Sequence, residues 1–224
     1  MLNLSQVTLW ACVFSENAEY LDRTCRVIEY CRRLCTFGET ILFSHLWPPH
    51  VPHNGQIVTC RMVQIPKMDL DNFNIFVNRI VPEFIKTDYA MQVHEDGFIL
   101  EPDLWHPDFL KYDYIGAPWR DGVVGNQGFA LESKKLLQAK AKLPFSERLP
   151  KPYDGQNHFP SDVFICRTHR AALESDGVRF APRDLAMRFS TEQIGQNFRS
   201  FGFHGRAINP TSYRIGWNKI AASE

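Results

Sequence analysis

The sequence has no run of the roughly 18 to 20 apolar residues that a membrane-spanning helix needs. Its N-terminus, Met1-Leu-Asn-Leu-Ser-Gln6, lacks the charged segment and the following apolar segment of a secretory signal. Net charge is also lacking, because 25 Lys and Arg balance 25 Asp and Glu. A neutral chain has no general electrostatic attraction to nucleic acid or anionic lipid. We therefore expect a cytoplasmic protein that is not recruited to its partner by overall charge.

Several common motifs are missing as well. No G-x-G-x-x-G or Walker loop follows the first two predicted strands, which argues against dinucleotide oxidoreductases and P-loop enzymes. A nucleotidyltransferase would need a basic glycine-rich loop after the first strand, where the chain has Phe14-Ser-Glu-Asn-Ala18. The cysteines form no C-x-x-C pair and have no histidine at zinc-finger spacing. We expect reduced, mostly buried thiols at Cys12, Cys25, Cys31, Cys35, Cys60 and Cys166.

The composition is that of an ordinary globular protein. Hydrophobic residues make up 44% of the chain and charged residues 22%. A chain of 224 residues can bury one sizeable core but is short for two domains that each carry a site. No repeat, low-complexity tract or linker divides it. We expect a single domain over residues 1–224.

Strands and helices alternate in the first part of the chain. The apolar run Val7–Phe14 predicts a strand buried on both faces, and Ser15 is a candidate N-cap for a helix over Glu16–Cys35. Three further strands and a helix with a candidate kink at Pro82 follow the same rhythm. This order predicts an α/β fold with a mostly parallel central sheet flanked by helices. The expected strands are Thr40–Ser44, Ile57–Ile65 and Tyr89–Val93, and the helix is Leu70–Lys86.

The rhythm changes after residue 96. Loops rich in proline, glycine and aromatic residues are expected over 101–128. Helical patterns follow over Glu132–Leu143 and Asp162–Leu173, separated by a loop-rich insert over 144–160.

Polar residues follow the strand predicted at Tyr89–Val93. His94, Glu95 and Asp96 stand directly after it, at the end where open α/β sheets bind ligands. Carboxylate oxygens suit Mg²⁺ or Mn²⁺, so the cluster is a candidate metal site. An ordinary polar turn after a buried strand explains this stretch equally well when it is taken alone.

Six segments of the second half together resemble a known family. They match, in order, the patterns Q-x-D-G-F, Y-D-Y-I-G-A-P-W, G-N-G-G-F-x-L-R, E-D-x-x-I-C, F-x-x-E and S-F-G-F-H-G of a bacterial and phage family. That family is catalogued as a domain of unknown function and is related to the nucleotide-diphosphosugar (GT-A) glycosyltransferases. The resemblance covers roughly residues 7–205. The matching segments are His94–Phe98, Tyr112–Trp119, Val124–Leu131, Ser161–Cys166, Phe189–Glu192 and Ser200–Gly205.

The resemblance implies a GT-A-like fold and a metal-dependent site. Asp96 matches the last acid of the D-x-D element that holds the metal, and His204 matches a C-terminal histidine that returns to the same ion. His94 and Glu95 replace the other positions of that element. We expect both near the nucleotide-sugar donor, with His94 donating hydrogen bonds to neighbouring loops rather than binding the ion, and Glu95 contacting the ribose or supporting the metal through water. A structural salt bridge is an equally good explanation for Glu95. The expected cofactor is Mn²⁺ or Mg²⁺.

The resemblance also implies a catalytic acid. Asp162 matches the acid that, in inverting transferases, deprotonates the acceptor hydroxyl. Ser161 stands where the family has glutamate. A carboxylate at a helix start is also a common N-cap, so capping is the alternative role of Asp162.

The remaining site residues are expected around the sugar and the nucleotide. The turn Gly125, Asn126, Gln127 and Gly128 can pass its backbone close to a sugar, and Trp119 can offer an apolar platform. Turn formation and core packing are the alternative roles. Glu192 is a candidate acid beside the metal or the acceptor, and a surface glutamate is the alternative. Topology alone places the donor nucleotide near Phe14, Ser15 and Ser44.

The resemblance therefore predicts a glycosyltransferase. We expect transfer of a sugar from a nucleotide-diphosphate donor, such as a UDP- or GDP-sugar, to a hydroxyl acceptor, with Asp162 as base. A glycan or lipid-linked acceptor is favoured over a nucleic acid, because the chain carries no net charge. The alternative is a non-catalytic module that binds carbohydrate or nucleotide sugar on the same fold, which the changes at His94 and Ser161 would suit.

Overall fold

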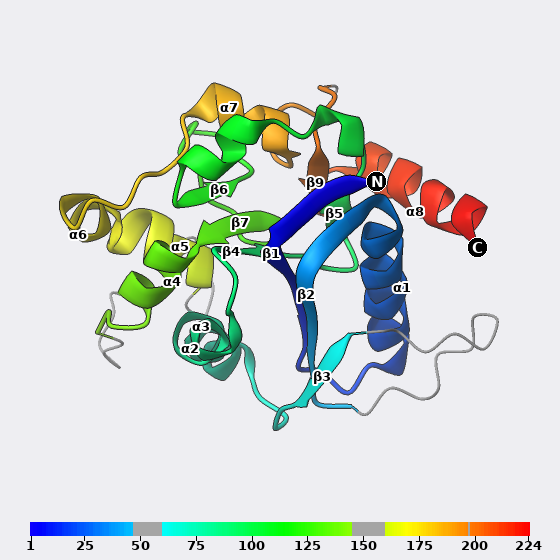
Figure 1. Ribbon diagram of the computed structural model, residues 1–224, viewed down its shortest axis with the longest axis horizontal. Coiled ribbons are helices and arrows are strands. Elements are labelled where there is room, and N and C mark those ends of the chain that lie inside the picture. The colour runs from blue at the N-terminus through cyan, green and yellow to red at the C-terminus, as the bar shows by residue number, and fades with distance from the viewer. Residues whose placement is uncertain (47–59, 145–159, 197) are drawn as a thin grey trace.

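The structure is a computed structural model that describes residues 1–46, 60–144, 160–196 and 198–224. A six-stranded sheet has helices on both faces and a small three-stranded sheet beside it (Figure 1). In the large sheet the order is β3-β2-β1-β4-β7-β6; the first four strands are parallel, and β7 runs antiparallel to β4 and β6. The predicted α/β fold is therefore confirmed. The strands are β1 (Leu2–Val13), β2 (Cys35–Ser44), β3 (Arg61–Gln64), β4 (Tyr89–Gln92), β6 (Tyr114–Gly116) and β7 (Ala130–Ser133).

The central strand β1 is buried on both faces, as its unbroken apolar run predicts. Successive side chains of a strand point to opposite faces. Leu9, Ala11 and Val13 join the hydrophobic cluster that includes helix α1 (Ala18–Leu34), whereas Trp10 and Cys12 join a second cluster with α2 (Leu70–Arg79) and α3 (Val81–Phe84). Two separate cores thus sandwich the sheet.

Helix α1 begins later than the sequence predicts. Its N-cap is Asn17, whose side chain accepts a hydrogen bond from the Tyr20 N–H at 3.2 Å, so the assignment of Ser15 as the cap is wrong. Ser15 Oγ instead accepts from the Asn17 N–H at 3.4 Å, which shapes the turn before the helix. The predicted helix over Leu70–Lys86 is broken at Ile80, because Pro82 lies in the first turn of a separate helix, α3. The predicted strand Ile57–Ile65 appears as β3, and its first residues lie outside the described part of the chain.

Two helices predicted in the second half are shorter than expected. Glu132 and Ser133 belong to strand β7, and the Ser133 hydroxyl caps helix α4 (Lys134–Lys140) by accepting from the Leu136 N–H at 3.1 Å. The helix predicted over Asp162–Leu173 is divided into three parts: α5 (Ser161–Val163), a π-helical segment (Phe164–Thr168) and α6 (Arg170–Ser175). Most of the predicted loop at 144–160 lies outside the described residues. The stretch 101–128 is mainly irregular, with 3-10 turns at Pro102–Leu104 and Pro107–Lys111.

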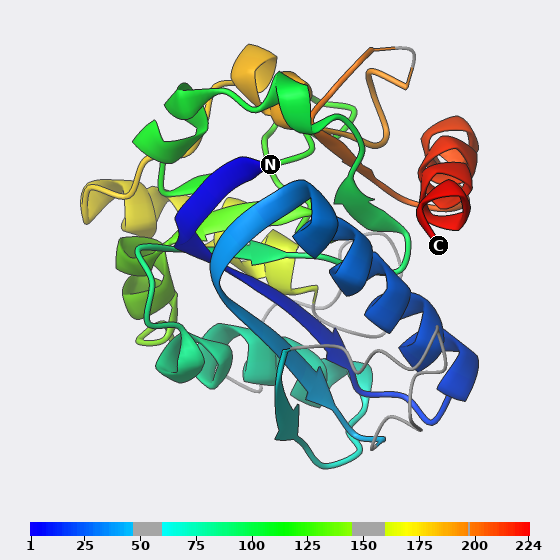
Figure 2. The same ribbon diagram turned by 45° about the vertical axis from the view of Figure 1, so that its right-hand side comes forward.

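The small sheet and the C-terminal helix are absent from the sequence prediction. β5 (Gly97–Ile99) pairs antiparallel with β9 (Gly202–His204), which pairs parallel with β8 (Ser190–Thr191). Helix α7 (Arg183–Phe189) leads into β8, and α8 (Pro210–Ser223) follows β9 and lies beside α1 in both views (Figures 1 and 2). This pairing brings residues 97 and 204 side by side, more than a hundred residues apart in the chain.

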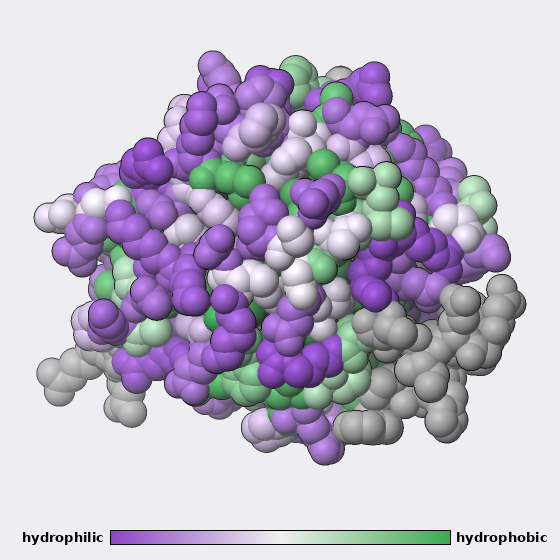
Figure 3. Space-filling view, viewed as in Figure 1, coloured by the Kyte–Doolittle hydropathy of each residue, from purple (hydrophilic) through white to green (hydrophobic). Residues whose placement is uncertain are grey.

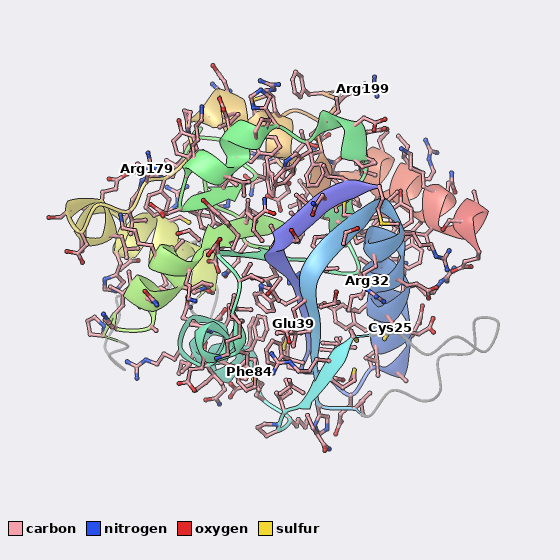
Figure 4. The ribbon with its side chains drawn as sticks, viewed as in Figure 1. Cys25, Arg32, Glu39, Phe84, Arg179 and Arg199 are labelled. Carbon is pink, nitrogen blue, oxygen red and sulfur yellow. The ribbon has the colours of Figure 1, made fainter. Side chains whose placement is uncertain are left out.

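The face of the molecule seen in Figure 3 is mainly polar. Hydrophilic side chains cover most of the face in Figure 3, and apolar ones form small separate patches. At the sheet edge, the Arg61 guanidinium of β3 pairs with Glu39 of β2 at 2.6 Å and lies 5.6 Å from the Phe84 ring; Glu39 and Phe84 are labelled in Figure 4. All six cysteines are free and five are buried, as expected from their spacing. Among the described residues, we find no helix with both the length and the apolar character needed to cross a membrane.

Candidate active site

A cavity of about 180 Å³ lies at the carboxyl end of β4. Segments that are far apart in the sequence meet here, because β4 ends next to the turn before β7, the start of α5 and the end of β9. Helix α2 closes the remaining side. The lining residues are Leu70, Phe73 and Asn74 of α2, Gln92 at the end of β4, His94 just after β4, Asn126, Gln127 and Gly128 of the turn before β7, Pro160, Ser161 and Asp162 at the start of α5, and His204 of β9.

Two half-buried histidines of this lining, together with the half-buried Asp96 next to it, could hold a metal ion; Asp96 itself is not a lining residue. His94, Asp96 and His204 each offer one ligand atom, and these atoms all lie within 4.8 Å of one another. His204 Nε2 is 3.6 Å from Asp96 Oδ1, so the structure brings together the two residues predicted to share an ion. His94, which the sequence analysis places beside the donor, is the third member. Two imidazoles and a carboxylate make a donor set that fits a divalent transition metal.

Glycines make the close approach of these groups possible. β5 and β9 pair in the register Gly97 to His204. A Cβ atom at Gly97 would lie 2.8 Å from His204 Cδ2, and one at Gly128 would lie 1.9 Å from His204 Nε2. Neither position has room for a side chain while the His204 ring stays in place. The glycines of the His94–Phe98 and Val124–Leu131 segments are therefore part of the site.

The charges of two of the three candidate ligands, His94 and Asp96, suit metal binding. Burial, helped by the charge of His204, lowers the pKa of His94 to about 4, so this imidazole is neutral at physiological pH. Burial alone would raise the pKa of Asp96, but the neighbouring His204 and His94 outweigh it and lower the pKa. For His204 burial acts to lower the pKa, yet the hydrogen bond to Glu192 and the charge of Asp96 outweigh burial and raise it. The cluster thus offers an ionised carboxylate and a neutral imidazole.

Glu192 connects this cluster to the turn before β7. One of its carboxylate oxygens lies 3.0 Å from His204 Nδ1, and the other accepts from Asn126 Nδ2 at 2.5 Å. The Asn126 side-chain oxygen accepts in turn from the Gly128 N–H at 3.1 Å. Glu192, for which the sequence left a surface position open, is buried.

Asp162 lies in the same cavity with its carboxylate close to the helix start. Its Oδ1 accepts from the Val163 N–H at 2.8 Å. Burial raises the pKa of Asp162, outweighing this hydrogen bond, and the charge of Glu192 adds to the rise. A carboxylate with a raised pKa is a better proton acceptor. The neighbouring Ser161 is held in the fold, because its hydroxyl accepts from Asn78 Nδ2 at 2.7 Å and its N–H donates to Asn74 Oδ1 at 3.1 Å.

A buried ion pair between Glu132 and Lys140 supports the turn before β7. Gln127 Nε2 donates to Glu132 Oε1 at 3.1 Å, and the other oxygen of Glu132 lies 2.6 Å from Nζ of the fully buried Lys140. The sequence analysis missed both charged residues, because it placed them on one predicted helix and gave neither a role. It also missed Asn74 and Gln92; the signal for Asn74 was its spacing of four residues from Asn78 on the apolar stripe of α2, where both are buried.

Other predicted site residues lie outside the cavity lining formed by the described residues. Glu95 pairs with Arg23 at 3.4 Å and accepts from the Tyr213 hydroxyl at 3.3 Å, which is its predicted alternative role as a salt bridge. Burial raises the pKa of Glu95. Trp119 packs on Gly125, and the Arg167 guanidinium lies 4.4 Å from its ring.

The residues predicted from topology to meet the donor nucleotide also lie outside the lining. Ser44 donates its hydroxyl hydrogen bond to the Leu46 carbonyl at 2.6 Å. Ser15 faces the turn before α1. Phe14 contacts the lining, since its ring stacks on that of Phe73, a lining residue, at a centroid distance of 4.3 Å.

Two solved structures show the same fold. A glycosyltransferase involved in the glycosylation of the major capsid of PBCV-1 is 14% identical, with a TM-score of 0.54 over 96% of this chain and 98% of that one. The glycosyltransferase GlyE of Streptococcus pneumoniae TIGR4 is 12% identical, with a TM-score of 0.50. That match covers 97% of this chain but only 60% of GlyE, so the chain spans less than two thirds of it. No curated protein matches the sequence.

The fold is therefore that of GT-A-like glycosyltransferases. The family comparison is more direct than these distant likenesses. A family model described as "Protein of unknown function (DUF5672)" matches residues 77–204, which is more than half of the chain and includes the candidate metal ligands, Asp162 and Glu192. The chain belongs to the DUF5672 family.

Proposed function

We propose that this protein is a metal-dependent glycosyltransferase that moves a sugar from a UDP- or GDP-sugar to a hydroxyl acceptor with inversion at the anomeric carbon. One observation carries the proposal: His94, His204 and the acid Asp162 line one cavity, and Asp96 completes a candidate metal cluster with the two histidines, in a fold shared with glycosyltransferases. Because the cavity draws on residues from α2 to β9, we also propose that residues 1–224 act as one domain.

The three candidate ligands fit Mn²⁺ better than Mg²⁺. Mg²⁺ prefers oxygen ligands and retains water, whereas imidazole nitrogen suits transition metals. A divalent ion held here would neutralise the charge that develops on the leaving diphosphate. The chain's own contribution is to keep His94 neutral and Asp96 ionised, and to hold the His204 ring against Gly97 and Gly128.

Asp162 is proposed as the general base. Asp162 is half-buried in the cavity lining, and its raised pKa strengthens the carboxylate as an acceptor for the proton of the attacking hydroxyl. Attack in line with the leaving diphosphate inverts the anomeric centre. Asp162 is fixed by the Val163 N–H and stands without a second acid, because Ser161 occupies the position before it.

The cavity suits the reacting end of the donor. Its volume of about 180 Å³ is below the roughly 300 Å³ of a small-ligand pocket, so the whole nucleotide sugar does not fit inside. We place the sugar and diphosphate there and the nucleoside over the stacked rings of Phe14 and Phe73. The acceptor is proposed to be a glycan or a lipid-linked hydroxyl, since zero net charge does not favour binding along a nucleic acid.

A non-catalytic module that binds carbohydrate or nucleotide sugar is the second candidate. Ser161, at the position where the family resemblance leads us to expect a glutamate, is engaged with Asn78 and cannot assist Asp162. Such a module would bind the donor without turnover.

Release of free nucleotide from a panel of UDP- and GDP-sugars, with and without Mn²⁺, tests the proposal. We expect Mn²⁺-dependent release that D96A abolishes and D162N slows by about 10²- to 10⁴-fold, the usual contribution of general base catalysis. The exposed Asp103 provides a matched control, and D103N should retain full activity. Donor binding without release would favour the binding module, and equal rates for wild type and D162N would remove Asp162 from the mechanism.

A further inference from the structure

Glu192 is a buried acid between two parts of the site. It follows β8 directly, and β8 lies beside β9, the strand that ends in His204. Its side chain is only 3% exposed, and both carboxylate oxygens have a partner in the site. A carboxylate can only accept hydrogen bonds when ionised, so both partners must donate to it.

The first consequence concerns His204. Its Nδ1 lies 3.0 Å from the Glu192 carboxylate, so Nδ1 carries the proton. The neutral ring then has its lone pair on Nε2, the nitrogen that faces Asp96 at 3.6 Å. A carboxylate that fixes the tautomer and orientation of a histidine in this way raises its quality as a metal ligand.

The second consequence concerns the turn before β7. Asn126 has a φ of +51°, the left-handed region, which among non-glycine residues asparagine tolerates best. Its side chain is held at both ends, because Nδ2 donates to Glu192 and Oδ1 accepts from the Gly128 N–H. The Gly128 backbone in turn lies against the His204 ring, since a Cβ there would be 1.9 Å from Nε2. The turn and the ring are thus fixed by one carboxylate and pack on each other.

We propose that Glu192 is a positioning residue that couples the metal ligand His204 to the sugar-side turn Asn126–Gly128. The inference rests on the proposed function for the identity of the two sites, while the coupling itself is a property of the metal-free chain. Through Glu192, an ion held by His204 stabilises the turn, and a ligand seated on the turn stabilises the His204 ring. Such coupling is reciprocal by thermodynamic necessity.

The substitution E192Q tests the bridge with little change in volume. A carboxylate accepts from both partners, whereas an amide has one oxygen and one NH₂ group and can accept from only one of them. If the oxygen faces His204, the NH₂ group meets the Asn126 NH₂ group, and that asparagine cannot turn over because its oxygen holds the Gly128 N–H. We expect Mn²⁺ to bind about 10- to 100-fold more weakly, as when other partners of metal ligands are removed.

Two readouts need no metal. Amide hydrogen exchange at Gly128 should become severalfold faster in E192Q. Imidazole ¹⁵N shifts of His204, taken where the ring is neutral, should change from the Nδ1-protonated form to a mixture of tautomers.

A compensating change separates positioning from general packing. N126D alone places a carboxylate against the Glu192 carboxylate at the 2.5 Å contact and should loosen the turn. The double variant E192Q/N126D restores complementarity, because the introduced amide donates to the introduced carboxylate, which still accepts from the Gly128 N–H. We expect the double variant to recover slow Gly128 exchange, the wild-type His204 tautomer and most of the Mn²⁺ affinity.

The control is E174Q, the same change at a glutamate that pairs with Arg170 on the exposed side of α6, and it should match wild type in all three readouts. The inference is overturned if E192Q leaves Gly128 exchange and the His204 tautomer unchanged, or if the double variant is no better than the two single ones. Failure of the proposed function has a different signature: wild-type protein would bind no Mn²⁺ while both metal-free readouts still respond to E192Q.

Discussion

At the scale of a single residue, the Asp162 carboxylate occupies a position that lowers the stability of the fold at neutral pH. The carboxylate is ionised in water at neutral pH, but burial raises its pKa in the folded protein. The folded state therefore binds the proton more tightly than the unfolded state does. Stability falls as the pH rises from the unfolded pKa through the raised folded pKa, and it stays lowered above that range.

We expect D162N to stabilise the fold at neutral pH. The amide keeps the shape and the acceptor for the Val163 N–H but removes the ionisation that burial opposes. Thermal unfolding should show a higher midpoint for D162N than for wild type at neutral pH, although activity is reduced. The gap should shrink on acidification, as Asp162 becomes protonated in both states of the wild-type protein.

D103N serves as the control because Asp103 is exposed. Its midpoint should stay close to that of wild type over the same pH range. A D162N variant that is less stable than wild type at neutral pH would mean that the Asp162 carboxylate holds the local structure together and that its burial is not opposed.

At the scale of secondary-structure elements, the junction between β7 and α4 contains one buried ion pair. Lys140 Nζ and Glu132 Oε2 are 2.6 Å apart and both side chains are buried. Glu132 also accepts from Gln127, so this pair fixes a cavity residue as well as the helix. A buried pair of this kind is weak evidence for stability, but removing one partner leaves the other charge unpaired in the interior.

We expect K140M to lower the free energy of unfolding by about 3 to 5 kcal/mol, the usual penalty for breaking a buried pair. Urea denaturation of K140M and of K142M provides the measurement, because Lys142 lies two residues further on and is exposed. K142M should stay within about 0.5 kcal/mol of wild type. Equal midpoints for the two variants would show that the Glu132 charge is accommodated without Lys140.

The two halves of the chain differ in how many of their strands and helices can be predicted from the sequence. β1, β4 and α1 were predictable because long apolar runs and helical periodicity give signals that tertiary contacts do not alter. β5, β8 and β9 have two or three residues each and lie in loop-like sequence, so no period can develop. Their pairing is decided by contacts across the fold, which a single sequence does not display.

The site shows the same limit. Asp96, Asp162 and His204 could be named from the family resemblance, and the structure brings them to one region. His94 and Glu95 are adjacent in sequence, yet one faces the cavity and the other pairs with Arg23, because Glu95 lies in the tight turn that hydrogen bonds between His94 and Gly97 close. Lys140 and Glu132 could not be found, since their burial follows from a strand ending at Ser133 where the periodicity indicated helix.

At the scale of the whole molecule, helices α1 and α8, which are far apart in the sequence, together hold the backbone that precedes Asp96. Helix α8 lies beside α1 and packs against β5 and β9, the strands that carry Gly97 and His204 (Figure 2). Trp217 of α8 is the main link, because its indole N–H donates to the Glu95 carbonyl at 3.2 Å. The guanidinium groups of Arg23 and Arg26 of α1 lie 4.8 and 5.2 Å from its ring. The backbone just before Asp96 is therefore held by a helix at the far end of the chain.

From this arrangement we expect W217A to lower the free energy of unfolding by about 2 to 3 kcal/mol, below the full penalty for a buried tryptophan because Trp217 is only half-buried. Mn²⁺ affinity should fall as well, since Asp96 follows the residue whose carbonyl loses its donor. W217F keeps an aromatic face for the arginines but lacks the N–H, so it should recover much of the stability and less of the metal affinity. I215A, at a residue of the same helix that is 42% exposed, should change neither quantity appreciably. Chemical denaturation and calorimetric Mn²⁺ titration of the three variants separate packing from positioning: if metal affinity simply follows stability across them, the indole hydrogen bond has no specific role in placing Asp96.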